Sequence, residues 1–278
     1  RPPRLFDSSP TPPPRTRRQP RLAKEDTLVI FTTIMKQLAE KLDIVRDVAG
    51  SVLRNLVAAT DEASTPIPNR AEIVACNSPV LLQKHGKDTL SALNINWGQP
   101  GDVFPYLMYL METGSVYFDA IVSGTIISVG GMTETVVKES SKALLHWCAD
   151  MLKQGTPDMV VRFARSLEAL FEEKVGDDRV IVPLLKSLQL LFSEGAFGDS
   201  LDGTDVAMNF LNLIKNEMSG CGDVNKLMAC INVVVLLLGV SGPARFGAMK
   251  SLLFLLGHIN TSIRKYTAVH LYLNIIAD

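Results

Sequence analysis

From residue 102 onward, the sequence alternates stretches of helical periodicity with joints of only a few residues. Gly130 and Gly131 close one expected helix, Thr133 caps the next, and Pro157 suits a first turn, where its missing N–H needs no partner. Pro183 falls inside an expected helix and should kink it. No stretch has the alternation of a strand, so helix is expected to pack against helix. The expected helices cover residues 102–112, 115–130, 133–152, 157–174, 178–194, 204–219, 224–239, 243–258 and 260–276.

Two further helices are expected before this run. The first begins at Asp26, and its apolar residues fall at spacings of three and four on one face: Leu28, Phe31, Ile34, Met35 and Leu38. The second covers residues 43–56, and its expected inner face comprises Val45, Val48, Ala49, Val52, Leu53 and Leu56. Residues 60–100 break the pattern with four prolines. We interpret them as a long ordered loop or insert, of a length that is often functional.

Eleven helices joined by short turns predict antiparallel pairs stacked in a row. The expected fold is an all-α, HEAT- or armadillo-like α-solenoid over residues 25–278, with roughly 40 residues per pair. Two second helices carry a β-branched residue followed by arginine, at Val45-Arg46 and at Ile263-Arg264. We expect these arginines to stay at the helix edge and to tie neighbouring repeats together.

Residues 1–24 differ from the rest of the chain. They hold seven of the fifteen prolines, and seven cations against one carboxylate give them a net charge of +6. The formal charge of the whole chain is -1, which leaves -7 for residues 25–278. A segment of this composition is predicted to be disordered, as a linker or a gene-model extension; an SH3-type ligand or a transit peptide are the alternatives. The net negative charge of residues 25–278 argues against a nucleic-acid-binding surface, which would be basic.

No motif of nucleotide binding, serine hydrolysis or zinc proteolysis occurs in the sequence. The four histidines are far apart, and the carboxylate pairs at 172–173 and 177–178 suit cap and surface roles, with Asp178 capping the helix that follows. We therefore expect no catalytic site and no bound cofactor.

The cysteines Cys76, Cys148, Cys221 and Cys230 are scattered, without C-x-x-C or zinc-ligand spacing, so we expect reduced thiols in the cytosol and no metal site. The longest apolar stretch, near residues 231–240, is far shorter than the roughly 18 to 20 residues of a spanning helix.

Five short strings keep their order along residues 26–278. They are PIPNRAE at 66–72, NWGQP at 96–100 with Phe104-Pro105 after it, SVGGMTE at 128–134, DRVIVPLLK at 178–186 and IRK at 263–265. They resemble the I-P-H-R-x-E, N-W-x-x-P, S-L-G-G-L-T-E, D-R-V-x-V-P-L-L-K and I-R-K-T-T-A strings of the tubulin-folding cofactor D family. Tyr266 stands where that family usually has threonine. The resemblance covers the C-terminal part of a longer family member.

The resemblance implies a chaperone that acts after chaperonin release. Members of the family bind β-tubulin, bring it together with α-tubulin held by cofactor E, and engage a small Arf-like GTPase. With cofactors C and E they stimulate GTP hydrolysis on tubulin, and cofactor C supplies the catalytic arginine. The resemblance further implies a cytoplasmic location, associated with microtubules or the centrosome.

Charged residues at helix edges are the candidate partner-binding residues, because an α-solenoid offers a curved wall to a folded partner. The candidates are Arg46, Arg54, Asp119, Arg179, Lys186, Arg264 and Lys265. Each has a competing interpretation as a repeat-stacking or solvated residue. Since the body is acidic, we expect contact with acidic tubulin to rely on local apolar or basic patches. A HEAT scaffold or transport adaptor without tubulin specificity is the alternative function, and an enzyme with an unrecognised site is the third.

Overall fold

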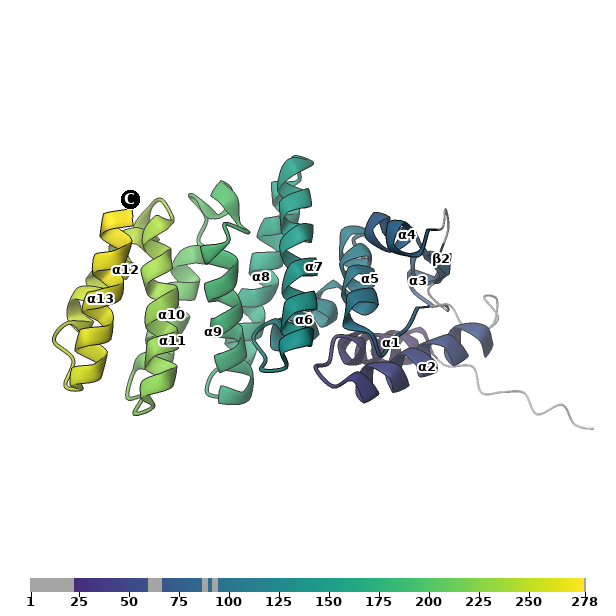
Figure 1. Cartoon of the computed structure of the whole chain (residues 1–278), viewed down its shortest axis with the longest axis horizontal. Helices are drawn as coiled ribbons and strands as arrows, with labels where there is room; N and C mark the ends of the chain where they lie inside the picture. The colour runs from purple at the N-terminus through teal and green to yellow at the C-terminus, as the bar shows by residue number, and fades with distance from the viewer. Residues whose placement is uncertain (1–22, 60–66, 87–89, 92–94, 278) are drawn as a thin grey trace, which may run out of the picture.

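The structure is a computed structural model that describes residues 23–59, 67–86, 90–91 and 95–277. Nearly all of the segment 1–24 lies outside the described residues, so its expected disorder stays a prediction. The described part contains thirteen α-helices, most of them in an elongated array (Figure 1). An all-α solenoid was expected, and the structure confirms this fold class.

The helices after residue 99 agree with the expected ones to within three residues at each end. They are α5 (Pro100–Glu112), α6 (Phe118–Val129), α7 (Glu134–Lys153), α8 (Pro157–Glu173), α9 (Asp178–Ser193), α10 (Val206–Met218), α11 (Val224–Leu236), α12 (Pro243–Leu255) and α13 (Thr261–Ala277). Two short 3-10 turns, η2 (Gly198–Leu201) and η3 (Leu237–Gly239), follow α9 and α11. Helix α9 runs without interruption through Pro183.

The helices of the array form two layers. In one layer α6, α9, α11 and α13 pack one after another, and in the other α5, α7, α8, α10 and α12 do so (Figure 1). Helix α1 (Lys24–Leu38) extends the first layer by packing against α6, and α2 (Asp43–Ala59) packs against α1. Each helix thus contacts near neighbours along the array, which is the defining arrangement of a solenoid.

The expected long loop at about 60–100 has more structure than its prolines indicated. Its described residues contain α3 (Arg70–Val74) and α4 (Pro79–His85), and a two-residue antiparallel ladder joins β1 (Ala75–Cys76) to β2 (Leu90–Ser91). Helices of five and seven residues are too short to repeat the apolar spacing over several turns, so periodicity could not predict them.

The expected inner face of α2 is wrong in part. The buried stripe of α2 runs through Arg46, Ala49, Gly50, Leu53 and Val57, whereas the side chains of two expected core valines are 58% and 41% exposed, at Val48 and Val52. An arginine and a glycine thus hold buried positions on this helix. The reason lies in the contacts that these two residues make, which are described below.

Aromatic side chains link successive repeats in the core. Phe118 of α6 lies 6.3 Å from Trp147 of α7, which contacts Phe163 of α8 edge-on at 5.6 Å. Phe163 stacks on Phe197, and two further ring contacts lead through Phe192 to Phe210 on α10. Such ring pairs add to the stability that burial supplies. The core is therefore continuous from α6 to α10.

Candidate protein-binding surface

Two of the five strings meet where the end of α6 packs against α9. A side-chain Cβ on Gly130 would lie 2.6 Å from the Cα of Pro183 and closer still to the carbonyl oxygen of Pro183. The two backbones are therefore in direct contact, which only glycine permits. The SVGGMTE and DRVIVPLLK strings form one packing joint, although about fifty residues separate them.

Two buried serines extend this joint on both sides. Ser128 Oγ donates a hydrogen bond to the carbonyl oxygen of Ala39 at the end of α1, at 2.5 Å. Ser187 Oγ on α9 donates to the carbonyl oxygen of Ile126 on α6, at 2.9 Å. Hydrogen bonding of buried hydroxyl groups to backbone carbonyls offsets the cost of burying them. These bonds fix α1, α6 and α9 relative to one another.

The NWGQP string holds the insert against the first helix pair. Trp97 is 1% exposed and lies against Gly50 of α2, where any Cβ would overlap the indole ring. Trp97 also contacts Tyr106 of α5 edge-on, with the ring centroids 5.4 Å apart. Gly50 therefore occupies a buried position because the indole needs that space.

The PIPNRAE string is clamped in a similar way. Arg70 Nη2 donates to the carbonyl oxygen of Val57 on α2, at 2.9 Å. The hydroxyl of Tyr117 donates to the carbonyl oxygen of Pro68, also at 2.9 Å. The string thus connects α2 to the start of α6.

Two of the seven candidate partner-binding residues turn out to hold helix joints. Arg46 is 1% exposed, and its Nη1 and Nη2 donate to the carbonyl oxygens of Glu40 and Gly98 at 2.8 and 3.1 Å. Arg264 Nη1 donates to the carbonyl oxygen of His258 at 2.7 Å and to that of Ile259 at 2.9 Å. Each arginine is the fourth residue of its helix and reaches a carbonyl six residues back. Arg46 is therefore not accessible to a partner, and its role is intramolecular.

The other five candidates lie on four different helices, and the structure does not gather them into one site. Arg54 is half-buried on α2, and Asp119 is exposed on α6, where it accepts a hydrogen bond from Ser166 Oγ of α8. Arg179 and Lys186 are exposed two turns apart on α9, and Lys265 is exposed on α13. Only the pair on α9 shares a helix face.

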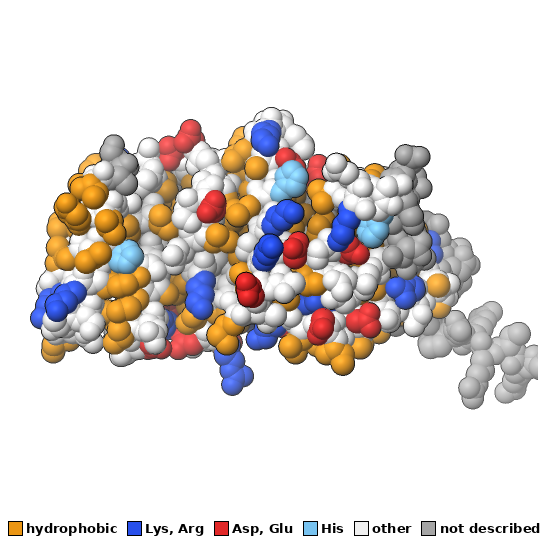
Figure 2. Space-filling model, in the orientation of Figure 1, with side chains coloured by type: hydrophobic (Ala, Val, Ile, Leu, Met, Phe, Trp, Pro, Cys, Tyr) orange, Lys and Arg blue, Asp and Glu red, His pale blue; other side chains and the backbone are white. Residues whose placement is uncertain are grey.

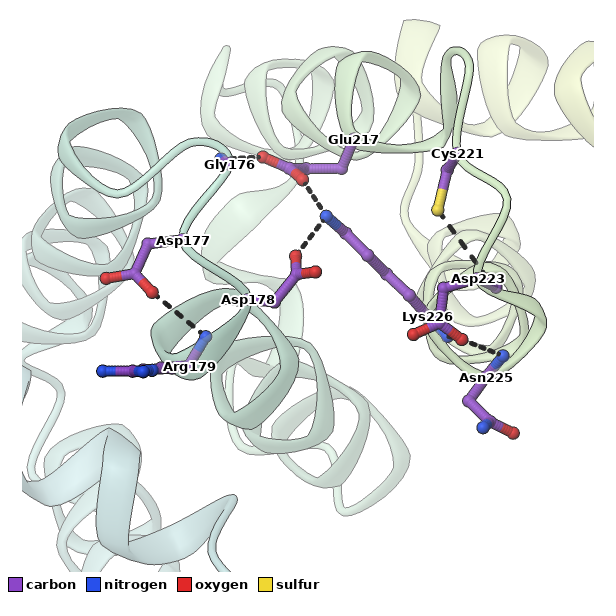
Figure 3. A network of polar contacts seen from close by, with 9 residues as sticks. All are labelled: Gly176, Asp177, Asp178, Arg179, Glu217, Cys221, Asp223, Asn225 and Lys226. Atoms are coloured by element: carbon purple, nitrogen blue, oxygen red, sulfur yellow. Dashed lines mark hydrogen bonds and ion pairs between the residues drawn. The ribbon is translucent and has the colours of Figure 1, made fainter.

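A charged network that we did not expect from the sequence joins three helices (Figure 3). Lys226 at the start of α11 is 7% exposed, and its Nζ lies 2.5 Å from Asp178 Oδ1 of α9 and 2.5 Å from Glu217 Oε2 of α10. The second oxygen of Glu217 accepts the backbone N–H of Gly176 at 2.8 Å. Asp177, rather than the expected Asp178, caps α9 by accepting the N–H of Arg179. Asp178 pairs with Lys226 instead.

The pKa of Lys226 reflects two opposing effects. Burial, the larger single effect, disfavours the ammonium group, but hydrogen bonds to Asp178 and Glu217 together outweigh it and raise the pKa above that of an ordinary lysine. Lys226 is thus charged at neutral pH. Its role is to neutralise two carboxylates where three helices meet.

The histidines have separate structural partners. His85 and His146 lie beside Asp102 and Asp150, the Nδ1 of His258 accepts the N–H of Asn260, and the ring of His270 contacts that of Tyr266 at a tilt. Within the described residues, no group of three or more His, Cys, Asp or Glu side chains is placed to hold a metal ion. Over the same residues, no helix has both the length and the apolar character that a membrane span requires.

All four cysteines are free, and three of them are buried. Burial raises the pKa of Cys148 to about 12 and that of Cys230 to about 12, and it also raises the pKa of Cys76. Because the thiolate is the reactive form, these three thiols are expected to be inert in the folded protein.

Native alkylation tests this accessibility. We expect iodoacetamide at pH 8 to modify the half-buried Cys221 at least tenfold faster than Cys76, Cys148 or Cys230, with each site followed by mass spectrometry. In denaturant all four should react at similar rates. Rapid native modification of Cys148 or Cys230 would contradict the packing described for α7 and α11.

A groove of about 520 Å³ lies between α5 and α7, with α4 at one edge. Pro105, Met108 and Tyr109 of α5 face Ala143 and Trp147 of α7 across it. Charged residues of both signs surround these apolar side chains, together with His146: Lys84, Glu112, Glu139, Lys142 and Asp150. In Figure 2 charged side chains gather over α7 and its neighbours. An apolar centre with a polar rim is the usual composition of a protein-binding surface.

Both ends of the array expose apolar side chains. At the α1–α2 end Val29, Ile44 and Val48 are more than half exposed. At the α12–α13 end Phe246, Phe254 and Ile259 are 78%, 82% and 93% exposed, and hydrophobic side chains cover this end in Figure 2. Exposed apolar patches of this kind mark contacts with other protein surfaces.

A sequence model of one protein family matches the chain over residues 29–226, which is more than half of its length. That family is described as the C-terminal part of tubulin folding cofactor D. The matched segment runs from α1 into the first turn of α11 and includes four of the five strings. No solved structure matches the chain.

Proposed function

Because the chain belongs to the tubulin folding cofactor D C-terminal family, we propose that it binds β-tubulin and acts with cofactors C and E in assembling the αβ heterodimer. Family membership itself establishes a tubulin folding cofactor D role. The single observation that carries the finer proposal is the match over residues 29–226. The order of the five strings supports it, since they hold the joints that give the array its shape.

We further propose that the chain stimulates GTP hydrolysis on tubulin without a catalytic group of its own. The family resemblance assigns the catalytic arginine to cofactor C and adds a small Arf-like GTPase as a partner. We place this activity in the cytoplasm, at microtubules or the centrosome. In this proposal the array contributes to GTP hydrolysis by holding its partners in the right relative positions.

In this proposal, the α5–α7 groove forms part of the surface that contacts tubulin. It lies inside the matched segment, and Pro105, which follows the NWGQP string, forms part of its wall. Its rim has charges of both signs, so it suits an acidic partner only through local pairs. Binding should therefore weaken only modestly as salt is raised.

A groove-filling variant tests this contact. Ala143→Arg places a long side chain into the groove from the half-buried face of α7, without removing any hydrogen bond. With the chain immobilised and purified β-tubulin in solution, we expect the variant to bind at least tenfold more weakly than the wild type, because a blocked central contact costs more than about 1.4 kcal/mol. Ala58→Arg, at an exposed position of α2, is the matched control and should bind like the wild type.

The outcomes separate the parts of the proposal. If the wild-type chain fails to retain β-tubulin or cofactor E, the chain is a scaffold of the alternative kind. If Ala143→Arg binds as well as Ala58→Arg, the contact lies elsewhere on the array. GTP turnover by tubulin should rise only when cofactors C and E accompany the chain, and turnover by the chain alone would show an enzyme instead.

A further inference from the structure

A second groove, of about 690 Å³, lies between α10 and α12. Its apolar wall includes Met208 and Met218 of α10, Leu227 of α11 and Leu255 of α12. Phe254, also in this wall, leaves 82% of its surface exposed. An exposed phenylalanine beside two half-buried methionines is costly in water unless another surface covers it.

The shape of the groove follows from a close approach of the two helices. A Cβ on Gly247 of α12 would lie 2.6 Å from Leu211 Cδ2 of α10. The same Cβ would lie 3.7 Å from the sulfur of Met208, which therefore sits directly beside the α12 backbone. Methionine side chains adapt to irregular apolar surfaces, so this wall can fit more than one apolar shape.

The ionisable side chains that line the groove are all basic. Lys215 of α10 and Lys250 of α12 are exposed, and His258 follows α12 at one end. No carboxylate lines the groove, whereas residues 25–278 together carry a net charge of -7. Within the described part of the chain, neither lysine takes part in an ion pair. The groove is thus a local basic site on an acidic protein.

We propose that the α10–α12 groove binds an amphipathic helical segment of a partner protein, with acidic residues flanking its apolar face. The apolar face would cover Met208, Met218 and Phe254, and its carboxylates would pair with Lys215 and Lys250. Burial of the apolar face supplies most of the affinity, and the charges select the acidic segment over a basic one. The groove spans the end of the family match, since α12 lies beyond residue 226, and the experiment that tests it uses no tubulin.

Fluorescence anisotropy with a synthetic peptide tests the proposal. The probe is a labelled peptide of roughly 16 residues, about 24 Å of helix, with a leucine face flanked by glutamates. A second peptide has lysines in place of the glutamates, and a third has serines in place of the leucines. The acidic peptide should bind the full chain at least tenfold more tightly than either companion, and more weakly as salt is raised.

Variants locate the binding on the array. Lys215→Glu/Lys250→Glu should weaken binding of the acidic peptide at least tenfold, and Phe254→Ser should do so through the lost apolar contact. Lys138→Glu/Lys153→Glu makes the same change of net charge at exposed lysines of α7 outside the groove, and it should leave binding unchanged. All variants alter exposed side chains, and thermal unfolding checks that they fold.

Equal binding of the acidic and basic peptides, or undiminished binding by Lys215→Glu/Lys250→Glu, would overturn the proposal. Equal weakening by the control pair would also overturn it, because a long-range charge effect would then explain the result. None of these readouts involves tubulin, so the outcome is independent of the β-tubulin test.

Discussion

The substitution Gly130→Ala is expected to lower the free energy of unfolding by about 3 kcal/mol or more. The new methyl group would overlap the backbone of Pro183, which cannot rotate away as a side chain would. Relief requires α6 to move away from α9, and this also strains the Ser187 hydrogen bond to Ile126. In thermal unfolding followed by circular dichroism, we expect the midpoint to fall by roughly 6 °C or more.

The matched control for this variant is Gly222→Ala. Gly222 has no atom within 4 Å of its Cβ position and does not have a positive φ, so alanine there should change the stability by less than about 0.5 kcal/mol. If Gly130→Ala and Gly222→Ala have the same midpoint of thermal unfolding, the backbones of α6 and α9 do not touch as described.

The substitution Lys226→Met should lower the free energy of unfolding by about 3 kcal/mol. It leaves the Glu217 carboxylate, whose side chain is 3% exposed, without its counter-charge. A buried charge that loses its partner retains the full cost of desolvation, whereas removing both charges is far less harmful. Asp178 contributes less, because its side chain is 59% exposed and remains hydrated.

A double variant separates this charge effect from simple loss of packing. In Lys226→Met/Glu217→Gln the amide oxygen can still accept the Gly176 N–H, and no buried charge is left. We expect the double variant to recover a large part of the stability lost in Lys226→Met, as measured by urea unfolding. A double variant that is less stable than Lys226→Met would show that the network is held by something other than charge pairing.

The network also predicts a dependence on alkaline pH. Burial opposes the charge of Lys226, but its hydrogen bonds raise the pKa above the ordinary lysine value of about 10.4. The stabilisation is therefore fully present below about pH 10.4 and is lost as the pH rises through the higher folded pKa. Over this alkaline range, the free energy of unfolding should therefore fall more for the wild type than for Lys226→Met.

The helices from α5 to α13 could be predicted from the sequence because each is long enough to repeat its apolar spacing several times. Their ends also carry local signals, such as the proline at the start of α8. The short helices α3 and α4 have no such repeat, and their positions depend on contacts with distant residues: the Tyr106 hydroxyl donates to the carbonyl oxygen of Ile73 on α3, and Lys84 of α4 pairs with Asp102. Long-range contacts of this kind leave no local pattern.

The buried face of α2 shows why apolar periodicity alone can mislead. Arg46 is buried because it satisfies the carbonyl groups of a helix joint, and Gly50 is buried because an indole ring occupies the adjacent space. Neither residue looks like a core residue. The valines that do look like core residues, Val48 and Val52, line an exposed apolar groove between α1 and α2 instead.

Residue type alone did not distinguish the charged residues that hold helix joints from those that lie on the surface. Arg46 and Arg264 were expected at the edges of helices, where they would tie neighbouring repeats together. Instead, each bonds to carbonyl groups of the joint just before its own helix, and Arg46 is buried. Lys226 was missed, although its spacing gave a signal. It falls four residues before Cys230 on the buried stripe of α11, a position where a lysine requires buried carboxylates nearby.

The contact between Gly130 and Pro183 has a mechanical consequence. Side chains between two helices can change rotamer and absorb a small rotation, but two backbones in direct contact cannot. A twist applied to α6 by a bound protein would therefore pass to α9 without being absorbed at this contact. The array should therefore bend at the interfaces where side chains separate the helices, whereas α6 and α9 should rotate together as one rigid unit.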